Sequence, residues 1–75
     1  MIPSTTKDQI DNYVNNKIPP GGFLYAVLSN NLMESFCRAD YNNTYYMKDI
    51  VEYIYNHTPL ICHGSPEKVK QWLEK

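Results

Sequence analysis

The sequence predicts an all-α protein, folded as one compact domain of about five short helices that spans residues 1–75. Three observations favour this fold class. Apolar residues recur at helical spacing in several stretches, residues that typically begin helices precede those stretches, and proline or glycine pairs separate them. With 43% hydrophobic and 13% aromatic residues, the chain has enough apolar material for one core.

The first helix is expected to begin at Thr6 and to run to about Lys17. Thr6 and Gln9 form a capping-box pattern, in which two side chains satisfy backbone N–H groups at the helix start. Four apolar side chains then share one face: Ile10, Tyr13, Val14 and Ile18. The helix must stop before Pro19-Pro20, because the residue before a proline disfavours helical backbone.

Two shorter helices are expected next. Residues 23–28 are apolar without a polar face, so we expect a central helix that is buried on nearly all sides. Asn31 and Glu34 form a second cap-like pair, which begins a third helix that reaches Ala39.

A longer fourth helix is expected after a polar turn at residues 40–43. Thr44 is its expected cap, and Thr58-Pro59 ends it. Its inner face is expected to consist of Met47, Ile50, Val51 and Ile54. Its outer face is expected to carry Lys48, Asp49 and Glu52.

The remaining chain is expected to form a short extended piece and a last helix. Residues 60–64 are mostly apolar and are expected to cross the core as a strand-like linker. Ser65 is a favoured cap, Pro66 suits the first helical turn, and Glu67 suits the positive end of the helix dipole. The inner face of this helix is expected to be Val69, Trp72 and Leu73.

The formal net charge is −1, and neither sign clusters strongly except for Lys68, Lys70 and Lys75 at the end. Binding to nucleic acid needs a dense basic face, so we expect no nucleic-acid partner. No apolar run approaches the roughly 18 residues of a membrane span, and the N-terminus lacks the pattern of a secretory signal, so we expect a cytosolic protein without a membrane partner. Domains this small are often stabilised by self-association, and we expect a homo-oligomer.

Cysteine and histidine side chains are the first candidates for chemistry. Cys37 or Cys62 beside His57 or His63 would suit nucleophilic catalysis or a zinc ion. Their spacing matches no paired ligand motif, and thiols among apolar residues usually pack as small hydrophobic groups. We therefore expect no catalytic residue, no metal, no cofactor and no enzymatic activity.

The turn at Pro20-Gly21-Gly22-Phe23 is a candidate ligand site. Helix starts present free N–H groups, and glycine allows a phosphate to approach the backbone closely. The start at Ser65 is a weaker anion site, because Pro66 lacks a donor and Glu67 repels anions. The residues expected to bind phosphate or a base are Pro20, Gly21, Gly22, Phe23, Tyr25, Ser65 and Lys68.

The seven tyrosines are a second candidate feature. Aromatic side chains are enriched at interfaces and stack on bases, although many tyrosines simply place the ring in the core and the hydroxyl in water. An oligomer interface, a ligand pocket and a plain surface all remain open. The candidate interface residues are Tyr45, Tyr46, Tyr53, Tyr55 and Trp72.

From Ile18 to Trp72 the chain resembles a family of small phage and prophage accessory proteins. The shared pattern starts with Ile18-Pro19-Pro20-Gly21-Gly22-Phe23-Leu24 and Ala26-Val27-Leu28-Ser29-Asn30. It continues with Ala39-Asp40, Ile50-Val51 and Tyr55-Asn56, and ends with Gly64-Ser65-Pro66-Glu67-Lys68-Val69 and Trp72. The family pattern has tryptophan before the glycine where this chain has His63, which weakens any catalytic or metal role for that segment.

The resemblance implies an accessory phage protein that is made in the host cytoplasm and counters host defence. The leading hypothesis is sequestration of a small nucleotide-derived ligand, with phosphate at Gly21-Gly22 and tyrosines on the base, in a pocket between subunits. The alternative is a protein-binding inhibitor of a host defence protein, comparable to an anti-CRISPR protein, that needs no small-molecule ligand.

Overall fold

The computed structural model describes residues 2–74, which form an all-α fold as predicted. The elements are α1 (Ser4–Asn16), α2 (Gly22–Leu28), α3 (Leu32–Arg38), α4 (Tyr41–Tyr45), α5 (Met47–His57), the short 3-10 helix η1 (Leu60–Cys62) and α6 (Pro66–Glu74). The described residues contain no strand. None of the helices in this range is long and apolar enough to cross a membrane.

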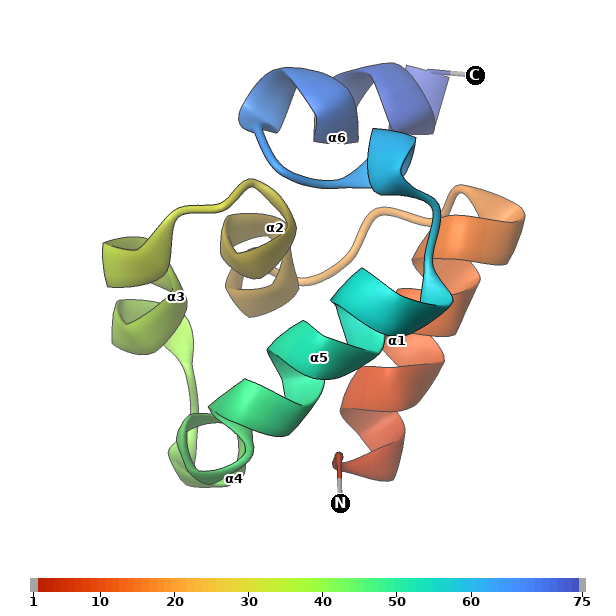
Figure 1. The fold of residues 1–75 in the computed structure, drawn as a ribbon. Coiled ribbons are helices and arrows are strands. Elements are labelled where there is room, and N and C mark those ends of the chain that lie inside the picture. Colours follow the sequence, from red (N-terminus) through yellow and green to blue (C-terminus); the bar gives the residue numbers. More distant parts are fainter. Residues whose placement is uncertain (1, 75) are drawn as a thin grey trace.

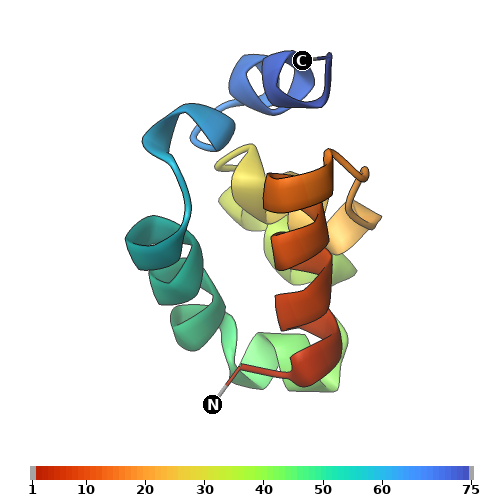
Figure 2. The same cartoon turned by 90° about the vertical axis from the view of Figure 1, so that its right-hand side faces the viewer.

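The helices surround α2, which lies near the middle of the molecule (Figure 1). The α1 and α5 helices run beside one another, and α6 lies across the end of the molecule where α1 finishes (Figures 1 and 2). The α3 helix packs on α2 at the side away from α1. The core is therefore enclosed by segments that are far apart in the sequence.

One polar network ties this core together. The core side chains are Ile10, Tyr13, Leu24, Leu28, Ile50, Ile54, Cys62 and Val69. The fully buried Tyr13 hydroxyl donates to the carbonyl oxygen of Cys62 at 2.6 Å. Trp72 Nε1 in turn donates to the Tyr13 carbonyl oxygen at 3.1 Å, and the Lys17 ammonium lies 3.0 Å from the centre of the Trp72 ring. These contacts fix both η1 and α6 against α1.

The predicted start of the first helix is wrong by two residues. The α1 helix begins at Ser4 after Pro3, and no side chain caps it. Thr6 is buried instead, and its hydroxyl donates to Asn43 Oδ1 at 2.7 Å. The Thr6 hydroxyl therefore forms a tertiary hydrogen bond with Asn43 and does not cap the helix. The end is as predicted, with Lys17 in left-handed backbone.

The α2 and α3 helices confirm one sequence prediction, the cap of α3, and contradict another, the burial of α2. Asn31 Oδ1 accepts from the Glu34 amide at 3.1 Å, which confirms the predicted cap of α3. The preceding Asn30 adopts left-handed backbone, and Asn31 N then donates to the Ala26 carbonyl at 2.9 Å. The α2 helix is not buried on nearly all sides, because Tyr25 is 41% exposed.

The α4 helix replaces the polar turn predicted at residues 40–43. The Asp40 carboxylate accepts from the Asn43 amide at 2.8 Å and caps this extra helix. Thr44 lies inside α4 and does not cap α5, which begins at Met47 without a side-chain cap. Val51, predicted on the inner face of α5, is 48% exposed, whereas Ile50 and Ile54 are buried in the core to which α1 and α5 both contribute.

The strand-like linker predicted at residues 60–64 is a 3-10 turn. Leu60 and Ile61 are exposed, and only Cys62 enters the core. Gly64 follows with φ 116° and donates its N–H to the Leu28 carbonyl at 2.7 Å. The predicted cap of α6 is confirmed, since Ser65 Oγ accepts from the Lys68 amide at 3.2 Å.

Candidate functional site

An apolar groove lies between α3 and α5 and has a volume of about 210 Å³. Its apolar lining consists of Val27, Leu32, Met47, Val51, Ile54 and Tyr55, and we call it the α3–α5 groove. Leu32, Val51 and Tyr55 are 67%, 48% and 68% exposed. Their side chains form an apolar rim that no described part of the chain covers, although such side chains usually gain by burial.

His63 lines the same groove and carries an unusual polar atom. Its Nε2 is buried and has no hydrogen-bond partner among the described residues. Burial lowers the pKa of His63, and the nearby Lys68 ammonium adds to the effect. The imidazole is therefore neutral at pH 7, which keeps the lining of the groove uncharged.

This buried histidine predicts a pH-dependent stability. The unfolded chain binds a proton near pH 6.5 whereas the folded chain resists protonation, so the free energy of unfolding falls as the pH drops below about 6.5. The slope for one proton is at most about 1.4 kcal/mol per pH unit. Urea denaturation at several pH values between about 5.5 and 7.5 measures it.

The control for this prediction is the second histidine. His63→Gln is expected to lose this pH dependence, whereas His57→Gln, at an exposed position beside the Tyr53 ring, is expected to keep it. Equal pH dependence in wild type and His63→Gln would show that His63 is not responsible.

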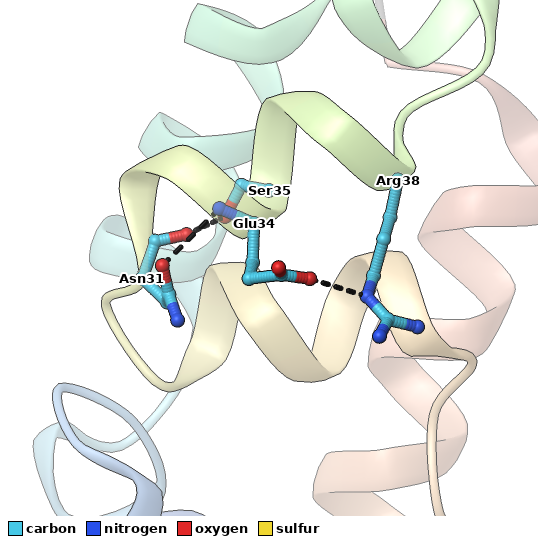
Figure 3. Close-up of polar contacts among 4 residues, drawn as sticks. All are labelled: Asn31, Glu34, Ser35 and Arg38. Carbon is cyan, nitrogen blue, oxygen red and sulfur yellow. Dashed lines mark hydrogen bonds and ion pairs between the residues drawn. The ribbon is translucent and has the colours of Figure 1, made fainter.

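A second, more polar hollow of about 340 Å³ lies where α2 and α3 meet the start of α6. Its lining includes Gly22, Tyr25, Ser29, Asn31, Glu34 and Arg38, and we call it the Ser29 hollow. Arg38 Nε donates to Glu34 Oε2 at 2.7 Å, and Figure 3 shows the Arg38 side chain lying over the ribbon of α2. Arg38 Nη1 lies 2.8 Å from the position that a Cβ on Gly22 would take, so a larger residue there would displace the end of this flexible side chain.

No protein-family model, curated protein or solved structure matches this chain. The two hollows and the surfaces around them are therefore the candidate binding sites of the described residues.

The residues predicted to bind a small ligand are only partly brought together. Gly22 and Tyr25 line the Ser29 hollow, while Phe23 packs against the core. Nothing lies within 4 Å of a Cβ built on Gly21. The other predicted ligand residues, Pro20, Ser65 and Lys68, do not line this hollow.

The side chains at the start of α6 have other contacts. Ser65 caps the helix through its hydroxyl, and Lys68 Nζ lies 3.6 Å from the position of a Cβ on Gly64. The α2 helix has only seven residues, too few to form a strong anion site from its dipole alone.

The predicted interface residues divide into two groups. Tyr45 and Tyr55 are largely exposed. The others, Tyr46, Tyr53 and Trp72, pack partly against the core. The Tyr53 hydroxyl donates to Asp11 Oδ1 at 2.6 Å, and this bond lowers the pKa of Asp11. The tyrosines thus form no single cluster, and Tyr55 alone borders the α3–α5 groove.

The two cysteines occupy different environments. Cys62 is buried as predicted, and burial raises the pKa of its thiol, which favours the protonated form over the thiolate nucleophile. Cys37 is exposed, so its predicted apolar surroundings are wrong, because α3 turns that side chain to solvent. Among residues 2–74, no three Cys, His, Asp or Glu side chains gather closely enough to hold a metal ion.

Most residues that line the two hollows were not predicted as site residues, among them Leu32, Val51, Ser29 and Arg38. The sequence did contain one signal for the groove. Leu32, Met33 and Phe36 are three large apolar residues in a helix of seven, more than one buried face of so short a helix accommodates. Burial of the Ser29 hydroxyl depends on packing between helices and has no local sequence signal.

Proposed function

We propose that this protein is a binding protein that docks a segment of another protein in the α3–α5 groove. The supporting observation is the exposed apolar rim of Leu32, Val51 and Tyr55 around an apolar hollow. Interfaces are typically organised in this way, with an anchoring side chain in a pocket and apolar contacts that exclude water around it.

The size and chemistry of the groove indicate what the partner inserts. An apolar cavity of about 150 Å³ holds a benzene-sized group, so 210 Å³ accommodates one large aromatic or branched aliphatic side chain. The lining contains no charged residue, and Asn30, Asn31, Ser35 and the neutral His63 supply its polar atoms. The expected partner segment is therefore apolar and uncharged at its centre.

The resemblance to phage accessory proteins supports one class of partner. We propose a host defence protein, with the small domain blocking a surface that the defence protein needs. This choice rests on the resemblance, whereas the groove itself supports protein binding in general.

The decisive variant is Val51→Asp. The side chain is half-exposed, so the fold should tolerate the change, but a carboxylate on the rim would have to be desolvated on docking. We expect affinity for the partner to fall by roughly 30-fold or more, because docking would bury this carboxylate without a partner. Ile18→Asp is the matched control, because Ile18 is equally exposed and does not line the groove.

The partner is captured on immobilised protein from defence-carrying cells, identified by mass spectrometry, purified and titrated by calorimetry. The proposal is supported if Val51→Asp weakens binding and Ile18→Asp does not. Equal binding by all three proteins would contradict it. A wild-type dimer that Val51→Asp dissociates would assign the groove to a second copy of the chain, and the proposed partner would then be wrong.

Sequestration of a nucleotide-derived ligand is the second candidate function. The observation that favours it is the Ser29 hollow, where Gly22 and Tyr25 lie beside a buried hydroxyl without a partner. Asn31 lines both hollows, but none of the rim residues Leu32, Val51 and Tyr55 lines the Ser29 hollow, so substitutions on the rim test the groove independently.

A further inference from the structure

We infer that the Ser29 hollow binds a small, flat, uncharged ligand whose edge both donates and accepts hydrogen bonds, as a nucleobase does. This inference deepens the second candidate function and does not depend on the α3–α5 groove.

The first observation is the unused hydroxyl of Ser29. The residue is only 6% exposed, and no described residue forms a hydrogen bond with its Oγ. A buried hydroxyl without a partner is unfavourable, and native proteins keep few such groups. A ligand in the hollow that Ser29 lines would supply the missing partner.

The second observation is the set of polar groups around this hydroxyl. Arg38 uses Nε for Glu34, which orients the guanidinium, and neither Nη group donates to a described residue. Asn31 uses Oδ1 to accept from the Glu34 amide, which leaves its amide nitrogen as a donor. The hollow therefore offers a ligand both kinds of group. Arg38 and Asn31 supply hydrogen-bond donors, and the second carboxylate oxygen of Glu34 supplies an acceptor.

The hollow has no net charge, which favours an uncharged ligand. Arg38 and Glu34 form an ion pair whose charges cancel, and the other lining residues are neutral. A phosphate would meet the Glu34 carboxylate as well as the guanidinium. An uncharged ligand with donors and acceptors on one edge can instead pair with both partners.

The third observation is the shape of the site. Tyr25 is partly exposed at the hollow and offers a ring on which a flat heterocycle can stack. Pro66 adds a second apolar surface. The volume of about 340 Å³ lies at the lower end of ligand pockets, which suits one heterocycle better than a dinucleotide.

The test uses adenosine, guanosine, cytidine and uridine as probes against the full chain, followed by NMR of the isotope-labelled protein. At least one nucleoside is expected to cause saturable shifts of the Ser29 and Tyr25 amides, with a Kd of roughly 0.1 to 1 mM. Ser29→Ala is expected to weaken that binding about tenfold, while Ser4→Ala, at an exposed serine of α1, leaves it unchanged.

Thermal unfolding separates this role from a structural one. The melting temperature of Ser29→Ala is expected to equal or exceed that of the wild type, because the change removes a hydroxyl that the fold does not use. A clear drop in melting temperature would mean that the fold itself uses this hydroxyl and would overturn the inference.

Three further outcomes would overturn it: no saturable shift with any of the four nucleosides, equal binding by Ser29→Ala, or saturation of the same amides by inorganic phosphate alone. Val51→Asp is expected to bind the nucleoside as the wild type does, so failure of the groove proposal would leave this result unchanged.

Discussion

Tyr13→Ala is expected to destabilise the protein by about 3–5 kcal/mol, because it removes a fully buried ring and leaves a cavity in the core. The free energy of unfolding expected for 75 residues is only about 4–11 kcal/mol, so this change is expected to remove a large part of the stability of the protein. Far-UV circular dichroism during urea titration measures the loss.

Tyr13→Phe separates the hydroxyl from the ring. This variant keeps the ring but removes the hydroxyl that donates to the Cys62 carbonyl oxygen at 2.6 Å. It should lower the free energy of unfolding by about 1–3 kcal/mol, because the buried carbonyl is left without its donor. Tyr41→Phe is the matched control, since Tyr41 is 84% exposed and its change should stay within about 0.5 kcal/mol. Equal stability of the two phenylalanine variants would contradict the importance of the Tyr13 bond.

Gly64→Ala is expected to lower the free energy of unfolding by about 1–3 kcal/mol, because alanine would be strained in the backbone conformation of this position. Gly64 has φ 116°, a conformation that residues with a side chain rarely adopt. An added Cβ would meet only the Lys68 side chain at 3.6 Å, which is an ordinary contact, so steric overlap contributes little. Chemical denaturation of the variant measures the cost.

The same substitution at Gly21 is the control. Gly21 has φ −65° and open space around the position of a Cβ, so Gly21→Ala should change stability by less than about 1 kcal/mol. If both alanine variants were equally stable, the backbone of Gly64 would not require glycine.

The sequence predicted the fold class and those helix boundaries that nearby residues decide. Asn31 and Ser65 cap α3 and α6 because each acceptor lies three residues before the amide that it binds. The prediction failed where distant residues intervene. The Thr6 hydroxyl bonds to Asn43, 37 positions away, and Val51 stays half-exposed because it lies at the α3–α5 groove.

The candidate sites were predicted only in part for the same reason. Gly22 and Tyr25 were expected at a ligand site and do line the Ser29 hollow. Arg38 lies over Gly22 only because α3 folds back on α2, a packing that no local pattern encodes. Tyr55 was expected at an interface, but the other side chains of the groove rim became visible only in the structure.

The contacts of Tyr13 with Cys62 and Trp72 also bear on how the protein folds during synthesis. These hydrogen bonds join positions 49 and 59 residues apart, so they close nearly the whole chain into a loop. Local helices form quickly, whereas contacts between distant residues must first overcome the entropy of loop closure. During synthesis on the ribosome, we therefore expect α1 to stay without its core contacts until η1 and α6 have been made. The core is expected to be complete only after α6 has left the exit tunnel.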